Sequence, residues 1–475
     1  MGEWQRLLDG LDPQRQLPAV RETRNAVVAA GAGSGKTRVL SVRYLALVRE
    51  RGLDPERIIC LTFTNKAAAE MRERIHAMLA ACAEDDPAFR PALASFPASR
   101  VSTLDSFCSE IARNGAPRWG IAPDFGVDET AAREATAEFT VNWLMACRSD
   151  PLAAEFLAAN GLENAAEGLA ALASARGGLF GAVDSGFDAD AQLDGLLNLA
   201  RDHHALLTDL LKGGQDLDPG TAAGGKAWIE AAARFPDWPD DIHDPAGLRA
   251  LGDACAAVAG LRKPSGKSPA AGYYNGVTDQ VRSYADIVRL AAAVLTGGRQ
   301  EQALAFIRGY IRDAADARAA SGMLGFSDVA YLALATLRDD LTLRHWYASR
   351  FDAIMIDEFQ DNNVLQKDLL YLLAGDPRAN PRAGVVPGPE GLRPGVLFFV
   401  GDEKQSIYAF RQADVRVFRG LEDELSRAPG GLGRHDLSVN WRSEPGLIEF
   451  FNTTFAAVFP PSGAEARDYE ARFEG

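Results

Sequence analysis

The chain has 475 residues, of which 47% are hydrophobic and 24% charged, and its formal net charge is −15. The length corresponds to roughly three domains, and the composition is that of a globular protein with ample core. The acidic balance excludes indiscriminate nucleic-acid binding but leaves room for a local basic groove. The N-terminus is too polar for a secretory signal, and no apolar run reaches the ~18 residues that cross a bilayer, so we expect no membrane partner.

Cysteine and histidine usage argues against disulfides and metal centres. The five cysteines are scattered without a C-x-x-C spacing, and the six histidines form no ligand pattern. Scattered cysteines are typical of a reducing compartment. The sequence therefore predicts a cytoplasmic protein without disulfides, structural zinc or an iron–sulfur cluster.

Six short apolar runs each end in a polar segment. In chain order they occupy residues 25–37, 57–65, 100–108, 351–361, 396–406 and 436–443. Most do not alternate polar with apolar residues, which is typical of strands buried on both faces of a parallel sheet. Helical patterns separate them, and in the first of these Met71, Ile75, Met78 and Cys82 form one apolar stripe. The sequence therefore predicts an α/β doubly wound domain whose ligands bind at the carboxyl ends of the strands.

Between about residues 111 and 345 the chain becomes rich in Ala and Leu, with few β-branched runs. This pattern predicts a mostly helical domain, 111–345, inserted into the α/β domain. The α/β domain then comprises residues 1–110 and 346–455, followed by a tail at 456–475. The Gly/Pro-rich stretch 262–276 is predicted to be an exposed loop.

The stretch "AGAGSGKT" follows the first apolar run and precedes a helical pattern. A phosphate-binding loop needs glycines so that backbone N–H groups can surround phosphates, a lysine for the β- and γ-phosphates, and a hydroxyl for Mg²⁺. Lys36 and Thr37 fit the last two roles, and Ala30 stands where a first glycine is usual. We therefore predict that ATP is bound by Ala30, Gly31, Ala32, Gly33, Ser34, Gly35, Lys36 and Thr37.

Two adjacent acids follow the apolar residues 353–355. Asp357 could complete the coordination of the Mg²⁺ ion opposite Thr37, while Glu358 could take a proton from the attacking water. Such a pair alone is also typical of a solvated strand end. The upstream phosphate-binding loop favours the catalytic interpretation.

The segment "GDEKQSIYAFRQAD" (401–414) places polar and aromatic side chains directly after a buried strand. The amide of Gln405 carries both a donor and an acceptor, so it can register a γ-phosphate. In an extended segment Tyr408 and Phe410 would project on one face, about 6.6 Å apart, so that a base could stack between them. Arg411 could hold a neighbouring phosphate or a carboxylate. The alternative is that both rings are core residues.

Several motifs, in order, resemble those of the UvrD/Rep/PcrA group of superfamily 1 DNA helicases. They are "AGAGSGKT", "LTFTNKAAAEMRERI", "IDEFQD", "GDEKQSIYAFR" and "NWRS"; "TLDSFC" and "FSDVAYLAL" are closer to the AddA and RecB motors of helicase–nucleases. The resemblance implies a RecA-like P-loop ATPase domain (1A) with the helical insertion as domain 1B. It also implies an ATP- and Mg²⁺-dependent 3′-to-5′ DNA helicase or translocase in double-strand-break repair, whose partner is a second, AddB- or RecC-like protein.

The resemblance extends the predicted nucleotide site. Gln16 resembles the glutamine that reads adenine, although its spacing leaves Gln14 open. Arg38 and Trp441 resemble residues that pack on the adenine base. Arg442 resembles the arginine that neutralises charge on the transferred phosphoryl group, with a structural salt bridge as the alternative. The predicted catalytic set is Lys36, Asp357, Glu358, Gln405 and Arg442.

The implied contacts with single-stranded and duplex DNA use hydroxyl, amide and aromatic side chains rather than a heavy basic patch. They are Phe63, Thr64, Asn65, Thr103, Ser106, Tyr408, Phe410 and Arg411. Such contacts reconcile DNA binding with the net charge of −15. The 262–276 stretch could also touch duplex DNA, but a solvated loop is the better interpretation.

The sequence ends about thirty residues after "NWRS", and nothing in it resembles the later helicase motifs, a second RecA-like domain or a nuclease domain. We therefore expect the first half of a longer motor. The alternative is a lobe that binds nucleotide and single-stranded DNA, with little ATPase activity until a partner or the rest of the chain completes the cleft. ATP turnover with and without single-stranded DNA distinguishes the two.

Overall fold

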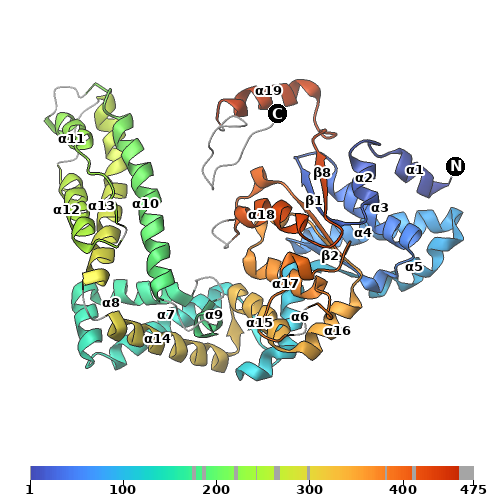
Figure 1. Ribbon diagram of the computed structural model, residues 1–475, viewed down its shortest axis with the longest axis horizontal. Coiled ribbons are helices and arrows are strands. Elements are labelled where there is room, and N and C mark those ends of the chain that lie inside the picture. The colour runs from blue at the N-terminus through green and yellow to red at the C-terminus, as the bar shows by residue number, and fades with distance from the viewer. Residues whose placement is uncertain are drawn as a thin grey trace. The chain divides into compact units, whose positions relative to one another are not determined.

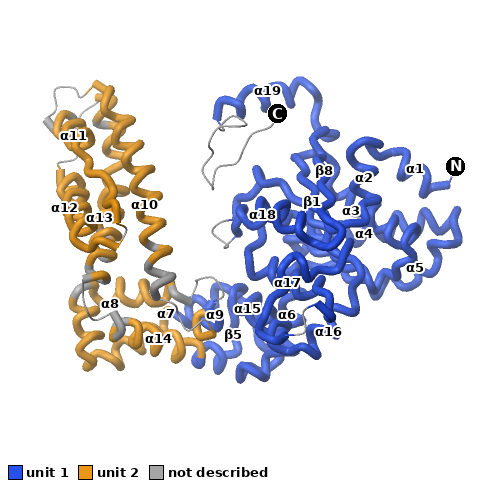
Figure 2. The backbone as a smooth tube through the Cα atoms, viewed as in Figure 1, with its two compact units in different colours: residues 1–136, 174–181, 316–475 blue, residues 137–173, 182–315 orange. Residues whose placement is uncertain are grey.

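A computed structural model describes residues 2–173, 178–184, 189–218, 223–241, 243–261, 268–296, 300–379, 382–408 and 413–458. The chain folds into two compact units (Figure 2). The first comprises residues 1–136, 174–181 and 316–475, and the second comprises residues 137–173 and 182–315. Each unit contains a hydrophobic core of its own.

The first unit contains a parallel six-stranded sheet with the strand order β3-β2-β6-β7-β1-β8. Its strands are β1 (Asn25–Ala30), β2 (Ile58–Thr62), β3 (Arg100–Thr103), β6 (Ala353–Ile356), β7 (Leu397–Gly401) and β8 (Leu432–Leu437). Because the strands are parallel, their carboxyl ends lie at one edge of the sheet. Since β7 lies between β1 and β6, the segments that leave these three strands emerge as neighbours.

The helices of the first unit that bear on the site begin and end as follows: α1 (Glu3–Asp9), α2 (Gln16–Arg21), α3 (Lys36–Arg51), α4 (Asn65–Asp85), α5 (Arg90–Ser95), α6 (Leu104–Gly115), α15 (Phe326–Asp339), α16 (Leu341–Arg350), α17 (Val364–Ala374), α18 (Val415–Ser426) and α19 (Pro445–Ala456). The apolar stripe predicted for α4 is present: Met71, Ile75 and Cys82 are buried. Met78 is half-buried and packs against the same core.

Both faces of the sheet are buried, as the apolar runs predict. On one face, Val28, Met355 and Val400 belong to a core shared with α3 and α4. On the other face, the ring of Phe399 lies 4.5 Å from that of Phe359, which also approaches Phe418 of α18. Figure 1 shows α3 and α4 on one side of the sheet and α17 and α18 on the other. The α/β doubly wound architecture is thereby confirmed.

The second unit is helical. It contains α8 (Pro151–Ala173), α10 (Ala189–Gly213), α11 (Ala223–Ala233), α12 (Pro245–Ala259) and α13 (Pro269–Thr296), while α7 (Glu129–Ala146), α9 (Gly178–Asp184) and α14 (Gln300–Ser321) cross its boundaries. A two-stranded parallel sheet of β4 (Gly126–Val127) and β5 (Met323–Leu324) belongs to the first unit. The second unit lies inside the predicted insertion at 111–345. It is smaller because α15, which that prediction included, packs on α6 and α17.

Two predictions about local structure are wrong. The stretch 262–276 is not wholly a loop, because α13 begins at Pro269 and Tyr274 is buried, donating its hydroxyl to the carbonyl oxygen of Leu211. Residues 262–267 lie outside the described part of the chain. The last predicted strand, 436–443, is displaced: β8 ends at Leu437. As an edge strand with exposed charged positions, β8 lacks the apolar run that marks the other strands.

Across the described ranges, no helix is both long enough and apolar enough to cross a membrane.

Candidate nucleotide and DNA site

The phosphate-binding loop predicted at residues 30–37 joins β1 to α3. Gly33 and Gly35 have φ values of 75° and 87°, which L side chains rarely adopt. Gly35 is the N-cap of α3 and provides no side-chain cap, so the first N–H groups of the helix can face an anion. Ala30 is the buried last residue of β1, where extended backbone needs no glycine. Within the described structure the buried Ser34 hydroxyl has no hydrogen-bond partner, and the loop fits a phosphate chain.

Lys36 and Glu358 form an ion pair at the carboxyl edge of the sheet. The Lys36 Nζ lies 2.8 Å from Glu358 Oε2, and the lysine side chain is 11% exposed. Among the described residues, Glu358 is the one non-glycine residue with a positive φ, at 51°. Backbone strain of this kind clusters at functional sites. Here the strained residue is the carboxylate that meets the lysine of the phosphate-binding loop.

Asp357 is buried at the end of β6, and its Oδ1 accepts the N–H of Glu358 at 3.0 Å. Burial, followed by repulsion from Glu358, raises the pKa of Asp357 to about 6, and the Lys36 ammonium offsets this only in part. A buried carboxylate with so little compensation is suited to a divalent cation, so Asp357 fits the predicted Mg²⁺ role. Thr37, the other predicted ligand, lies in the first turn of α3.

A third carboxylate, Asp361, was not predicted. Burial, followed by repulsion from Glu358, raises its pKa to about 7. Its Oδ2 accepts a hydrogen bond from Gln360 Nε2 at 3.3 Å, while its buried Oδ1 has no partner among the described residues. The signal for it was its place in "IDEFQD", four residues after Asp357.

Gln16, rather than Gln14, reaches the phosphate-binding loop. Gln16 is 4% exposed, and its Nε2 donates to the carbonyl oxygen of Ser34 at 2.9 Å. Its Oε1 accepts the N–H of Asp12 at 3.1 Å, whereas the side chain of Gln14 is exposed. Arg38, the other residue predicted to pack on adenine from this part of the chain, is exposed on α3.

The side chain of Asn440 fastens the segment after β8 to the phosphate-binding loop. Its Nδ2 donates to the carbonyl oxygen of Ala32 at 2.8 Å, and its Oδ1 accepts the N–H groups of Arg442 and Ser443, each at 2.9 Å. Sequence reasoning selected the neighbours of Asn440 but not Asn440 itself. Its amide, two residues before the predicted arginine, was the available signal.

Backbone contacts bring the rest of the "NWRS" segment to the same loop. The N–H of Trp441 donates to the carbonyl oxygen of Gly33 at 2.9 Å, and the N–H of Gly31 donates to that of Leu437 at 3.2 Å. The Trp441 residue is 63% exposed, and Arg442 is exposed as well. Both predicted side chains therefore start from backbone held at the loop and extend into solvent.

A continuous series of hydrogen bonds leads from the phosphate-binding loop to Gln405. The Gln360 Nε2 donates to Glu358 Oε2, the oxygen already paired with Lys36, at 3.0 Å. The N–H of Asp402 donates to Gln360 Oε1 at 2.9 Å, and Gln405 Nε2 donates to Asp402 Oδ2 at 2.7 Å. The segment that leaves β7 thus shares a polar network with the lysine and the glutamate.

The predicted base slot is organised differently from the prediction. Phe410 and Arg411 lie outside the described residues. The ring of Tyr408 lies 4.6 Å from the ring of Phe63, at an interplanar angle of 38°. Phe63 follows β2, so two predicted DNA residues that are far apart in the sequence meet near the ends of β2 and β7.

The predicted hydroxyl contacts also serve as helix caps. The Thr64 Oγ1 accepts the N–H of Ala67 at the start of α4, which begins at Asn65. The Thr103 Oγ1 accepts the N–H of Ser106 at the start of α6, and the two hydroxyl oxygens lie 2.7 Å apart. Both caps follow strands at the same carboxyl edge of the sheet.

Known proteins place this arrangement in a family. The model of the family described as "UvrD/REP helicase N-terminal domain" matches residues 11–426. The chain belongs to this family.

Relatives of this family member share one name, which makes each of them part of an "ATP-dependent helicase/nuclease". The chain is 28% identical to the relative from Desulforudis audaxviator, over 95% of the chain and 40% of that protein. It is 25% identical to the relative from Staphylococcus aureus, over 96% of the chain and 40% of that protein. For the relative from Pelotomaculum thermopropionicum the identity is 26%, over 93% and 38%. The chain thus spans about two fifths of the length of these curated relatives.

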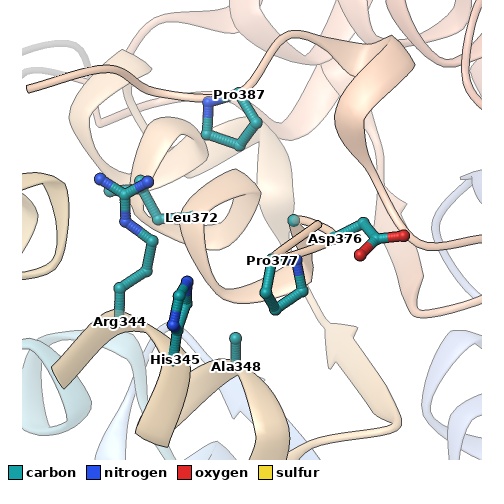
Figure 3. A pocket seen from close by; sticks show the side chains of 8 residues that line it. Arg344, His345, Ala348, Leu372, Asp376, Pro377 and Pro387 are labelled. Carbon is teal, nitrogen blue, oxygen red and sulfur yellow. The ribbon is translucent and has the colours of Figure 1, made fainter. Parts of the chain in front are cut away.

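A small cavity shares no residue with the predicted site. Arg344, His345 and Asp376 are among the residues that line it (Figure 3). The Arg344 guanidinium donates to the carbonyl oxygens of Leu337, at 2.7 Å, and Arg382, at 3.2 Å. Burial lowers the pKa of Arg344. Since Leu337 lies in the last turn of α15, Arg344 closes a helix end, and we assign this cavity a structural role in a helicase-family domain.

Proposed function

We propose that the chain is the ATP-dependent motor part of a DNA helicase or translocase of the AddA/RecB/UvrD type, which moves 3′ to 5′ and acts in double-strand-break repair. The observation that carries this proposal is the hydrogen-bond series from Lys36 through Glu358 to Gln405. It joins a phosphate-binding loop to the segment that carries Tyr408. A non-motor ATPase has no need of such a connection.

In this proposal each side chain acts on the phosphates of ATP. Lys36 leaves Glu358 to bind the β- and γ-phosphates, and Glu358 then orients a water and takes its proton. Thr37 and Asp357 hold Mg²⁺, which neutralises phosphate charge when bound. Gln405 senses the γ-phosphate, and Arg442 stabilises the charge that develops on the transferred group.

Single-stranded DNA runs along the carboxyl edge of the sheet in this proposal. Phe63 and Tyr408 stack against bases, while Thr64, Thr103 and Ser106 contact the backbone through hydroxyl groups. Asn65 adds an amide. The names of the relatives describe one component of a helicase/nuclease, so a second, AddB- or RecC-like protein is the proposed partner. The five free cysteines support a reducing, cytoplasmic location.

The test is ATP turnover by the chain with and without single-stranded DNA. We expect DNA-stimulated turnover, and we expect Lys36→Ala and Glu358→Gln each to lower it at least about 100-fold, because each removes a group that acts on the transferred phosphate. The exposed residues Lys212 and Glu163 offer matched controls. Lys212→Ala and Glu163→Gln should leave turnover within about twofold, since surface changes away from a site have small effects.

Turnover that survives both changes would refute the assignment. If the wild-type chain binds nucleotide and DNA but hydrolyses little ATP, the second candidate function holds: a binding lobe that a partner or further chain completes. The solvent-exposed side chains of Trp441 and Arg442 favour this candidate, because residues predicted to enclose the nucleotide are covered on one side only.

A further inference from the structure

Gln360 occupies an unusual position in the site. It lies in the 3-10 turn Phe359–Asp361 and is 1% exposed. A buried amide is costly unless both of its ends are hydrogen-bonded. Both ends of Gln360 are bonded, and to residues that follow two different strands, β6 and β7.

On the nucleotide side, Gln360 determines what holds Glu358. In the resting structure Glu358 Oε2 accepts from Lys36 Nζ at 2.8 Å and from Gln360 Nε2 at 3.0 Å. A phosphate that takes Lys36 removes the first donor. Gln360 is then the remaining side-chain donor to Glu358 among the described hydrogen bonds, so it sets where the carboxylate rests.

On the DNA side, Gln360 holds the start of the segment that leads to Tyr408. Its Oε1 accepts the N–H of Asp402, and its backbone carbonyl oxygen accepts Ser406 Oγ at 3.2 Å. The backbone approaches closely here, since a Cβ on Gly401 would lie 2.8 Å from the Gln360 Oε1. A movement of the amide therefore displaces residues 402–406 directly.

We propose that Gln360 is the positioning residue that couples nucleotide occupancy of the phosphate-binding loop to the grip on single-stranded DNA by the segment after β7. This inference rests on the proposed function and adds to it the residue that transmits the coupling. It also explains why a polar side chain occupies a position that an apolar one of equal length could fill.

The coupling can be measured by binding alone. Thermodynamic linkage requires that nucleotide and DNA change each other's affinity by one factor. Fluorescence anisotropy of a labelled oligothymidylate gives the dissociation constant with and without saturating Mg²⁺-ATPγS. For the wild-type chain we expect the two constants to differ by a factor of at least about 5.

Gln360→Met keeps the length of the side chain and removes both hydrogen bonds. We expect it to bring the factor to within about twofold of 1, while nucleotide affinity and DNA affinity measured separately change less than about threefold. Gln366→Met is the matched control, because Gln366 bonds Asn363 and Asp105 and not the relay. It should keep the wild-type factor.

Gln360→Glu covers the case in which the methionine variant does not fold. It keeps an acceptor for Asp402 but cannot donate to Glu358 when ionised, so the factor should again fall toward 1. Hydrogen exchange in the wild-type chain provides a measurement that needs no variant. Mg²⁺-ATPγS should change the exchange of the amides of residues 402–406.

The outcomes separate the two proposals. A wild-type factor above 5 that persists in both Gln360 variants, or unchanged exchange at residues 402–406, overturns the inference and leaves the proposed function standing. A wild-type factor of 1 overturns the proposed coupling of ATP to DNA itself, and the inference falls with it.

Discussion

Phe63 and Tyr408 are the two aromatic side chains that the fold brings together at the DNA edge. Their ring centroids lie 4.6 Å apart, so in the resting structure each ring occupies space that a base would need. A base that stacks on either ring must therefore part them. Both residues are half-buried, which leaves one face of the pair open to solvent.

Removing either ring should weaken DNA binding. Because stacking on one aromatic side chain contributes roughly 1–3 kcal/mol per base, we expect Phe63→Ala and Tyr408→Ala each to raise the dissociation constant for single-stranded DNA roughly 5- to 150-fold. Oligothymidylate and mixed-sequence DNA should be affected equally, because stacking does not depend on base identity. Trp346→Ala, a change at an exposed aromatic residue on α16, is the control. Unchanged affinity in both variants would contradict the stacking role.

At the level of residues, prediction succeeded where a motif fixes the chemistry locally. The glycines of the phosphate-binding loop and the acids after β6 carry their signal within a few positions. The contact between Phe63 and Tyr408 joins residues 345 positions apart, and the two hydrogen bonds of Gln360 join neighbouring strands, so only the folded sheet reveals them. The positive φ of Glu358 has no sequence signature either.

At the level of elements, the C-terminus of α2 and the edge strand β8 meet through one carboxylate. The Glu22 side chain is 7% exposed and accepts hydrogen bonds from Arg24, from backbone N–H groups and from His435 Nε2. Burial raises its pKa, but these hydrogen bonds outweigh burial and lower it to about 2. Burial lowers the pKa of His435 more than Glu22 raises it.

Both groups make the fold less stable in acid. The pKa of Glu22 is depressed in the folded state, so its stabilisation is complete above pH 4.5 and is lost as the pH falls toward 2. His435 is harder to protonate when folded, so stability falls as the pH drops below 6.5. We expect Glu22→Gln to lower the free energy of unfolding by about 2 kcal/mol at pH 7, and to match the wild type near pH 2.

Urea denaturation at pH 7, 5 and 3 measures this difference. Glu56→Gln, a change at an exposed glutamate, should cost less than about 0.5 kcal/mol at every pH. A pH-independent loss for Glu22→Gln would show that packing rather than charge holds these elements together.

The turn before β7 gives a second prediction for an element. Gly395 has a φ of 69°, and a Cβ there would overlap the carbonyl oxygen of Thr23. Gly384 has a φ of 80° with nothing within 4 Å of such a Cβ. Gly384→Ala should therefore cost about 1 kcal/mol for its backbone alone, and Gly395→Ala about 2 kcal/mol more, because the backbone itself must move. Equal losses of unfolding free energy would contradict this.

For the whole molecule, two separate cores predict two unfolding events. One core lies in the sheet-bearing unit, and the other, which includes Trp228 and Tyr274, lies in the helical unit. Calorimetry should show two transitions, and Mg²⁺-ATPγS should raise only one of them, because a ligand stabilises the unit that binds it. Trp228→Ala should lower the other transition. A single transition that responds to both changes would contradict independent units.

The division into an α/β part and a helical part was predictable because composition changes along the chain. The boundaries were not, because α15 resembles the insertion in composition but packs with the sheet-bearing unit. Local composition reports which element forms, whereas the partner of an element depends on contacts between distant segments.

The ion pair between Lys36 and Glu358 has a consequence for how tightly substrate can be held. In the resting state the protein supplies its own anion to the ammonium group, so an incoming γ-phosphate competes with an internal occupant. Part of the gross attraction is spent on displacing it, which keeps ground-state affinity modest and favours release after hydrolysis. The same displacement frees the carboxylate, so arrival of the fuel and arming of the base become a single exchange.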